Sequence, residues 1–228
     1  TIFAGPDYIL ANLSELFITL TEPFGTSRWA LTVAESHQPY FTDWIGQFTW
    51  NAIILFIVGA VLLFYQLFKN FKHKFYLTSG FSVFLLLFLM SRYSGASVFN
   101  GETPLSLTAF IGSIILFAIG MAYFYFNAFY NDKEEFSLMN KIDKRGFLIL
   151  LAFLVMAVGA RSAIRLFFIF TPFAMIFVGY ACVTLFEKAM LFKEQAYKYT
   201  AIVLIVLFAG FIFYGYYNTS FVQASNTG

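Results

Sequence analysis

The run TPLSLTAFIGSIILFAIGMAYFYFNAFYN, residues 103–131, contains no charged side chain. A helix over this range would extend roughly 40 Å, and about 20 apolar helical residues already cross the hydrocarbon core of a bilayer. Further uncharged runs cover residues 44–68, 75–91, 146–160, 166–186 and 199–228. This pattern predicts an all-α, polytopic membrane protein.

The composition of the 228-residue chain excludes a soluble globule. Hydrophobic residues make up 60% of the chain and charged residues 11%, whereas about 25% of residues are charged in an ordinary soluble domain. The formal net charge of +2 is too balanced for a nucleic-acid partner. The one cysteine, Cys182, lies in an apolar run, so no disulfide framework is expected.

The uncharged runs predict about six membrane-spanning helices, at residues 51–68, 75–91, 105–130, 147–160, 163–186 and 200–217. Ten of the fourteen basic residues lie in three of the joints, at 69–74, 131–145 and 187–198. By the positive-inside rule these joints are cytoplasmic, so both chain ends and the other two joints face outward. We expect a multi-pass protein of the cell membrane with its site facing outward, or alternatively of the endoplasmic reticulum membrane.

Residues 1–50 differ from the rest, because they hold five acidic residues and one basic residue. Within them, apolar residues from Ile9 to Leu20 recur at helical spacing, which predicts an amphipathic helix. We therefore expect three parts: an external loop over 1–50, a helical region over 51–217 and an external tail over 218–228. Because the first residue is Thr1, we expect the chain to be a piece of a longer protein.

Two strings carry a family resemblance. Residues 32–39 read TVAESHQP, and residues 161–172 read RSAIRLFFIFTP. Together they resemble the catalytic subunit of asparagine-linked oligosaccharyltransferase, and the T-V-A-E core is closer to its archaeal form. Two features depart from the family: Ser36 is an extra residue before the histidine, and the upstream acidic residues and downstream W-W-D-Y-G motif are absent. The tail would then lead towards a missing C-terminal domain.

The resemblance implies transfer of a glycan from a polyprenyl or dolichyl (pyro)phosphate carrier to the asparagine of an Asn-x-Ser/Thr sequon. It makes Glu35 a ligand of a divalent cation, Mg²⁺ or Mn²⁺, and an acceptor for the asparagine amide, and it makes Arg165 the group that binds the donor phosphate. The implied partners are the lipid-linked oligosaccharide, the acceptor polypeptide, membrane lipid and accessory subunits. Since no catalytic set is complete, the isolated chain is expected to be inactive.

The residues themselves support part of this assignment. Arg165 precedes 21 uncharged residues, which places a guanidinium at the depth of a lipid headgroup, where it can bind phosphate in two-pronged fashion. Arg161 shares its face if the helix is continuous. We include Arg161 and His37 among the candidate substrate-binding residues, but we expect Arg161 mainly to anchor the interface, so that Arg161→Lys is mild. A histidine in a loop, such as His37, is more commonly just exposed to solvent. On sequence alone the same holds for a loop glutamate such as Glu35.

Two other functions fit the same features. Another glycosyltransferase or ligase that uses a lipid carrier would also need an outward-facing arginine. A transporter or non-catalytic scaffold would explain apolar spans and a submerged arginine. A transporter, however, is expected to show repeated halves or helices broken at mid-membrane, and the sequence shows neither.

Overall fold

The computed structural model describes residues 38–226, and this part of the chain is helical. Five of its helices are long and apolar enough to cross a membrane, whereas a sixth, α4, has 17 residues and is shorter. The chain is thus a helical membrane protein with five candidate spans among the described residues, and the count of six stays a prediction. The elements in order are α3 (Phe41–Leu67), α4 (Lys74–Met90), α5 (Pro104–Asn131), α6 (Lys133–Met139), α7 (Lys144–Ser162), the 3-10 helix η2 (Ile164–Leu166), α8 (Phe167–Met190) and α9 (Gln195–Asn226).

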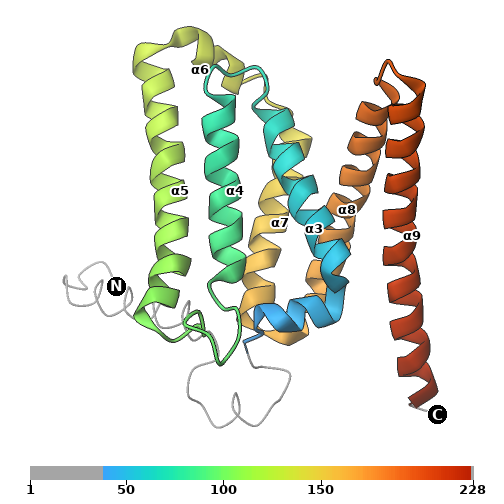
Figure 1. Cartoon of the computed structure of the whole chain (residues 1–228). Coiled ribbons are helices and arrows are strands. Elements are labelled where there is room, and N and C mark those ends of the chain that lie inside the picture. Colours follow the sequence, from blue (N-terminus) through green and yellow to red (C-terminus); the bar gives the residue numbers. More distant parts are fainter. Residues whose placement is uncertain (1–37, 227–228) are drawn as a thin grey trace, which may run out of the picture.

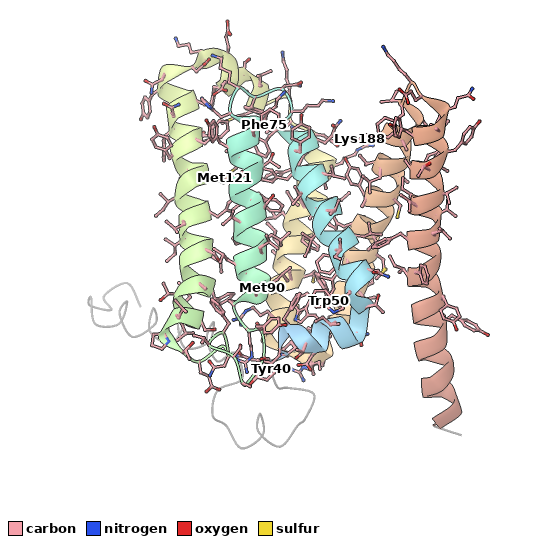
Figure 2. All side chains as sticks on the ribbon, in the orientation of Figure 1. Tyr40, Trp50, Phe75, Met90, Met121 and Lys188 are labelled. Carbon is pink, nitrogen blue, oxygen red and sulfur yellow. The ribbon has the colours of Figure 1, made fainter. Side chains whose placement is uncertain are left out.

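Successive long helices run in opposite directions, so the joints alternate between two ends of the bundle (Figure 1). One end holds the α3–α4 turn, α6 and the α8–α9 turn, and we call it the lysine end because all nine lysines lie at these joints or in the helical turns beside them. The other end holds the α4–α5 loop and the α7–α8 joint, with Arg92, Arg161 and Arg165, and we call it the arginine end. Tyr40 lies at the arginine end and Lys188 towards the lysine end (Figure 2).

The core is rich in aromatic residues and includes side chains of α3, α4, α5, α7 and α8. Phe56 and Phe170 meet edge to face with ring centroids 5.8 Å apart, and Phe153 lies 4.4 Å from Phe177. Gly59 allows α3 to approach α8, because a Cβ at this position would lie 2.1 Å from the carbonyl oxygen of Phe177. The absence of a side chain at Gly59 is therefore required for this packing.

At the lysine end, α6 is tied to the α3–α4 turn. Lys72 forms an ion pair with Asp132, and the backbone N–H of Lys72 donates to the buried Glu135 carboxylate at 2.9 Å. The hydrogen bond from Lys72 lowers the pKa of Asp132, with help from the Glu135 N–H, and the same bond raises the pKa of Lys72. The sequence analysis treats this stretch only as a joint, because α6 is short and mostly polar.

Two expected boundaries are corrected by the structure. The helix expected to begin at residue 51 begins at Phe41, so residues 41–50 are helical, while the external position expected for residues 1–50 stays a prediction. α3 bends at Thr49, whose φ of 63° is outside the helical range, and this bend turns its first part across the arginine end (Figure 1). At the other terminus, the helix expected to end at residue 217 continues as α9 to Asn226, while the external position expected for residues 218–228 stays a prediction.

Candidate functional site

Ser91 and Arg92, which follow directly after α4, lie at the centre of the arginine end. The Ser91 hydroxyl donates to the carbonyl of Phe88 at 2.8 Å, which closes the last turn of α4. The carbonyl of Ser91 accepts a hydrogen bond from the buried hydroxyl of Ser106 on α5. The short α4–α5 loop is therefore fixed at both of its ends.

Arg161, in the last turn of α7, reaches the same point. Its Nη2 and Nε donate to the Ser91 hydroxyl oxygen at 3.1 Å and 3.3 Å. Its guanidinium carbon lies 3.9 Å from the centroid of the Phe110 ring on α5. Only 8% of Arg161 is exposed. A single side chain thus joins α7 to both α4 and α5.

Arg92 joins this loop to the segment before α3. Its Nη1 donates to the Gln38 side-chain oxygen at 2.9 Å, and its guanidinium lies 4.7 Å from the centroid of the Tyr40 ring. The carbonyl of Arg92 accepts from the N–H of Phe41 at 2.7 Å. Gln38 and the buried Pro39 are the last two residues of the TVAESHQP string. The end of that string is therefore held on the α4–α5 loop.

A glycine makes room for Arg92. Gly101 adopts a φ of 90°, which disfavours any other L-residue, and a Cβ there would lie 2.4 Å from Arg92 Nη1. The Gly101 N–H donates to the Ser106 hydroxyl at 2.8 Å. The loop backbone is thus shaped around the guanidinium and anchored to α5.

The described residues at this end carry a net positive charge, because Arg92, Arg161 and Arg165 outnumber Asp43 and Glu102. The ion pair that the structure shows within residues 38–226, between Lys72 and Asp132, lies at the opposite end. Arg92 and Arg161 are close enough to repel each other, and Arg92 Nε is buried without a hydrogen-bond partner among the described residues. Positive groups in a partly desolvated environment attract anions more strongly than they would in water.

The structure describes Arg161 and Arg165, but not the other two candidate residues, Glu35 and His37. Arg165 lies in η2 with an exposed side chain, at the same joint as Arg161. Glu35 and His37 lie outside the described residues. Within the described part, no three His, Cys, Asp or Glu side chains gather as metal ligands. The described residues therefore offer no ligand set for the implied Mg²⁺ or Mn²⁺, and we derive no step through a metal.

The expectation for Arg161 is corrected. It does not lie at a lipid-facing interface but is buried between helices, as its contacts with Ser91 and Phe110 show. It also does not share a continuous helix with Arg165, because Ala163 has extended backbone angles (φ −155°, ψ 135°) and separates α7 from η2. Substitution of Arg161 is therefore not expected to be mild.

The sequence analysis did not single out Gln38, Ser91 or Arg92. One feature of the sequence could have indicated Arg92. The joints at the arginine end carry no lysine, and Arg92 is one of their three arginines. The partners of Arg92 were not predictable, because they lie 54 residues away in the sequence. Comparisons of the chain with protein-family models, with curated proteins and with solved structures find no match.

Proposed function

We propose that this chain is the membrane-embedded part of an oligosaccharyltransferase catalytic subunit. The transferred group is a glycan on a polyprenyl or dolichyl (pyro)phosphate, and the acceptor is the asparagine of an Asn-x-Ser/Thr sequon. One observation carries the proposal: the end of the first string and the beginning of the second string, which both resemble this family, lie together at the arginine end. Gln38, the second-last residue of the first string, contacts Arg92, and Ser91, the neighbour of Arg92, contacts Arg161, the first residue of the second string.

The electrostatics of this end suit the donor. A lipid phosphate is an anion held at headgroup depth, and the three arginines at this end, Arg92, Arg161 and Arg165, outnumber its two described carboxylates, Asp43 and Glu102. Arg165 has an exposed side chain, and its planar fork would bind the phosphate oxygens. Buried Arg161 is a positioning residue, since it contacts protein groups on both sides.

Glu35 has the complementary role towards the acceptor. It lies three residues before Gln38, and Gln38 contacts Arg92 at the arginine end. A carboxylate there would accept a hydrogen bond from the asparagine amide and orient its nitrogen for attack. The leaving group is the (pyro)phosphate, and its developing negative charge is stabilised by Arg165.

The test uses the full-length enzyme with a lipid-linked oligosaccharide and an Asn-x-Thr peptide. Glu35→Gln keeps the size and removes the charge, so it should lower turnover strongly while donor affinity stays nearly unchanged. Glu102→Gln is the matched control, because Glu102 is an exposed carboxylate at the same end. Equal turnover in the two variants, or no transfer by the unmodified full-length enzyme, would contradict the proposal. Transfer to water or to a non-peptide acceptor alone would favour another enzyme that uses a lipid carrier.

A further inference from the structure

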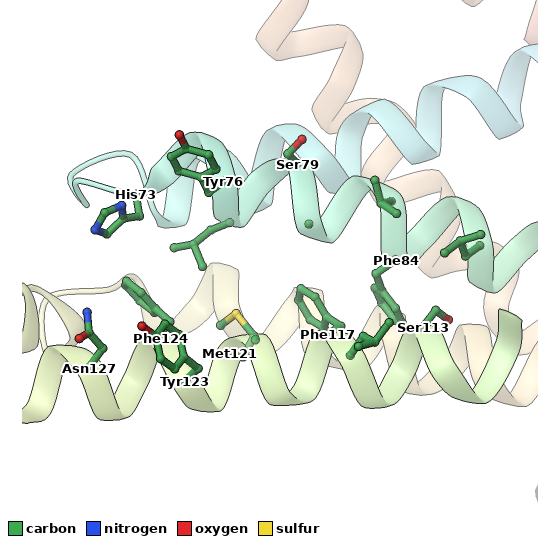
Figure 3. Close-up of a pocket in the computed structure, with 16 residues that line it drawn as sticks. His73, Tyr76, Ser79, Phe84, Ser113, Phe117, Met121, Tyr123, Phe124 and Asn127 are labelled. Atoms are coloured by element: carbon green, nitrogen blue, oxygen red, sulfur yellow. The ribbon is translucent and has the colours of Figure 1, made fainter. Parts of the chain in front are cut away.

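The loop that carries Arg92 is held in place at the arginine end itself. An antiparallel bridge pairs Arg92 with Asn100, so the α4–α5 loop is a short hairpin. Further along the two helices, mainly residues of α4 and α5 line a cavity of about 630 Å³ (Figure 3). None of the residues that line it belongs to the α4–α5 loop. The hairpin is held instead by the hydrogen bonds that join Ser91 and Gly101 to Ser106.

One guanidinium holds the residues on both sides of Pro39. Nη1 of Arg92 donates to the side-chain oxygen of Gln38 at 2.9 Å, and the guanidinium carbon lies 4.7 Å from the centroid of the Tyr40 ring. Tyr40 has extended backbone angles (φ −79°, ψ 161°), and a residue that precedes proline is restricted to the same region. Alternate side chains of an extended segment lie on one side of it. Gln38 and Tyr40 therefore both face Arg92, while the buried Pro39 points the other way.

The backbone continues this attachment into the first turn of α3. The N–H of Phe41 donates to the carbonyl of Arg92 at 2.7 Å, and the N–H of Thr42 donates to the carbonyl of Tyr93 at 3.4 Å. The ring of Tyr93 also stacks on that of Phe41, with the two centroids 6.1 Å apart. The segment at 38–42 is thus attached to Arg92 and Tyr93 both by side chains and by the backbone.

Stability alone does not explain an arginine at position 92. The Nε of Arg92 is buried and has no hydrogen-bond partner among the described residues, and a buried donor without a partner destabilises a fold. A glutamine at this position could donate to Gln38 without that cost. Arginine adds a planar group that donates from its edge and lies with its face on a ring at the same time. The contacts with Gln38 and Tyr40 need both of these properties.

Glu35 is close to this attachment along the chain. It precedes Gln38 by three residues, and three residues span at most roughly 11 Å. Freedom of movement at Gln38 is therefore passed on to Glu35. A displacement of about 1 Å at a reacting group can lower a rate about a hundredfold.

We propose that Arg92 is a positioning residue for the acceptor site: by holding Gln38 and Tyr40, it fixes where Glu35 meets the amide of the acceptor asparagine. The inference rests on the proposed function, which gives Glu35 that role. Arg92 acts through the segment before α3 and touches neither substrate. Its role thus differs from that of Arg165, which binds the donor phosphate.

The first part of the test measures how firmly the segment is held, without a transfer assay. Hydrogen exchange of the full chain in detergent, followed by mass spectrometry, reports on the amides of residues 41 and 42. Arg92→Gln should accelerate their exchange about tenfold, because it removes a hydrogen bond from a charged group and the contact with the ring. Gln38→Ala should act in the same direction, and it leaves the loop intact if Arg92→Gln fails to fold. Ser97→Ala is the control, because its hydroxyl donates within the loop itself.

The second part measures transfer by the full-length enzyme from a lipid-linked oligosaccharide to an Asn-x-Thr peptide. Arg92→Gln and Gln38→Ala should each raise the KM for the peptide and lower kcat/KM for it about tenfold or more. The KM for the donor should stay nearly unchanged in Gln38→Ala, which keeps the charge of this end. An enzyme that is only less stable loses active molecules, which lowers kcat and leaves both KM values as they were. The double variant should be no worse than the more affected single variant, because both changes break one contact.

The outcomes separate this inference from the proposed function. Faster exchange at residues 41 and 42 together with a raised KM for the peptide supports the inference, provided that Ser97→Ala changes neither. Unchanged exchange in both Arg92→Gln and Gln38→Ala, or faster exchange with unaltered peptide kinetics, would overturn the inference and leave the proposed function standing. No transfer by the unmodified full-length enzyme would overturn the proposed function, and the role of Arg92 in transfer would fall with it.

Discussion

The guanidinium of Arg161 donates to the hydroxyl oxygen of Ser91, 70 residues earlier in the sequence, with its Nη2 at 3.1 Å. The same guanidinium lies over the ring of Phe110. Because Ser91 is followed by Arg92, which contacts Gln38, this bond connects α7 to the segment before α3. The arginine end is thus organised by one buried charge.

Removing the acceptor of that bond should destabilise the protein. Ser91→Ala leaves a buried guanidinium without its hydroxyl partner, which costs about 1.5–3 kcal/mol of unfolding free energy. Arg161→Lys loses the two-nitrogen contact and should cost about as much. Ser162→Ala is the control, because that hydroxyl bonds only within its own helix, to Val158. Thermal unfolding in detergent measures all three, and a Ser91→Ala shift no larger than that of Ser162→Ala would contradict the role of this bond.

The close approach of α3 and α8 predicts a contrast between two glycines. Gly59→Ala would drive a Cβ against the backbone of Phe177, so we expect a loss of about 1–3 kcal/mol or more. Gly210→Ala, on α9 in open space, should stabilise the helix by about 0.5–1 kcal/mol. Unfolding temperatures of the two variants should therefore move in opposite directions, and a neutral Gly59→Ala would mean that the helices do not pack this closely.

The hydrophobic pattern predicts most of the fold, because long uncharged runs have few alternatives to helices that cross a membrane. It places the ends of α4 and α5 within one residue of the structure. It fails at the start of α3, because residues 41–50 are more polar than the rest of the helix and yet pack on α8: Trp44 lies 5.1 Å from Phe167. It also predicts a joint between the helices expected at 147–160 and 163–186, and Ala163 separates α7 from η2 there.

The candidate site is harder to predict from the sequence than the fold is. Whether Arg161 faces lipid or protein depends on where Ser91 and Phe110 lie, and these are set by the packing of α4 and α5 on α7. The roles of Glu35 and Arg165 stay predictions. The TVAESHQP string indicated where to look, but only the structure shows that Arg92 holds its last residues.

The ion pair at the lysine end predicts a pH dependence. The pKa of Asp132 is lowered by its bond from Lys72, so its contribution to stability is present at neutral pH and is lost as the pH falls through that lowered pKa. The pKa of Lys72 is raised, so its contribution is lost only as the pH rises through that raised value. Asp132→Asn keeps a helix-capping side chain and removes the charge.

We therefore expect the unfolding temperature of Asp132→Asn to lie slightly below that of the unmodified protein at neutral pH. The difference should be small, because exposed ion pairs contribute little, and it should vanish in acid. Unfolding curves of both proteins over this pH range provide the measurement. A difference that grows as the pH falls would contradict the assigned direction.

The topology is testable by cysteine labelling in intact cells, in a Cys182→Ala background. Cysteines at Asn70, Ser137 and Gln195, all at the lysine end, should be shielded from an impermeant thiol reagent. A cysteine at Ala96, in the exposed α4–α5 loop, should react. Labelling of the first group with protection of Ala96→Cys would reverse the orientation and would put the arginine end in the cytoplasm.

The phosphate-binding role of Arg165 is tested most directly by Arg165→Lys in the full-length enzyme, with initial rates of glycan transfer measured at subsaturating lipid-linked donor. Lysine keeps the charge and loses the planar fork. The proposed role predicts a fall in kcat/KM of about five- to a hundredfold, with Arg145→Lys, an exposed arginine at the lysine end, unchanged. An Arg165→Lys enzyme as active as the Arg145→Lys enzyme would contradict it.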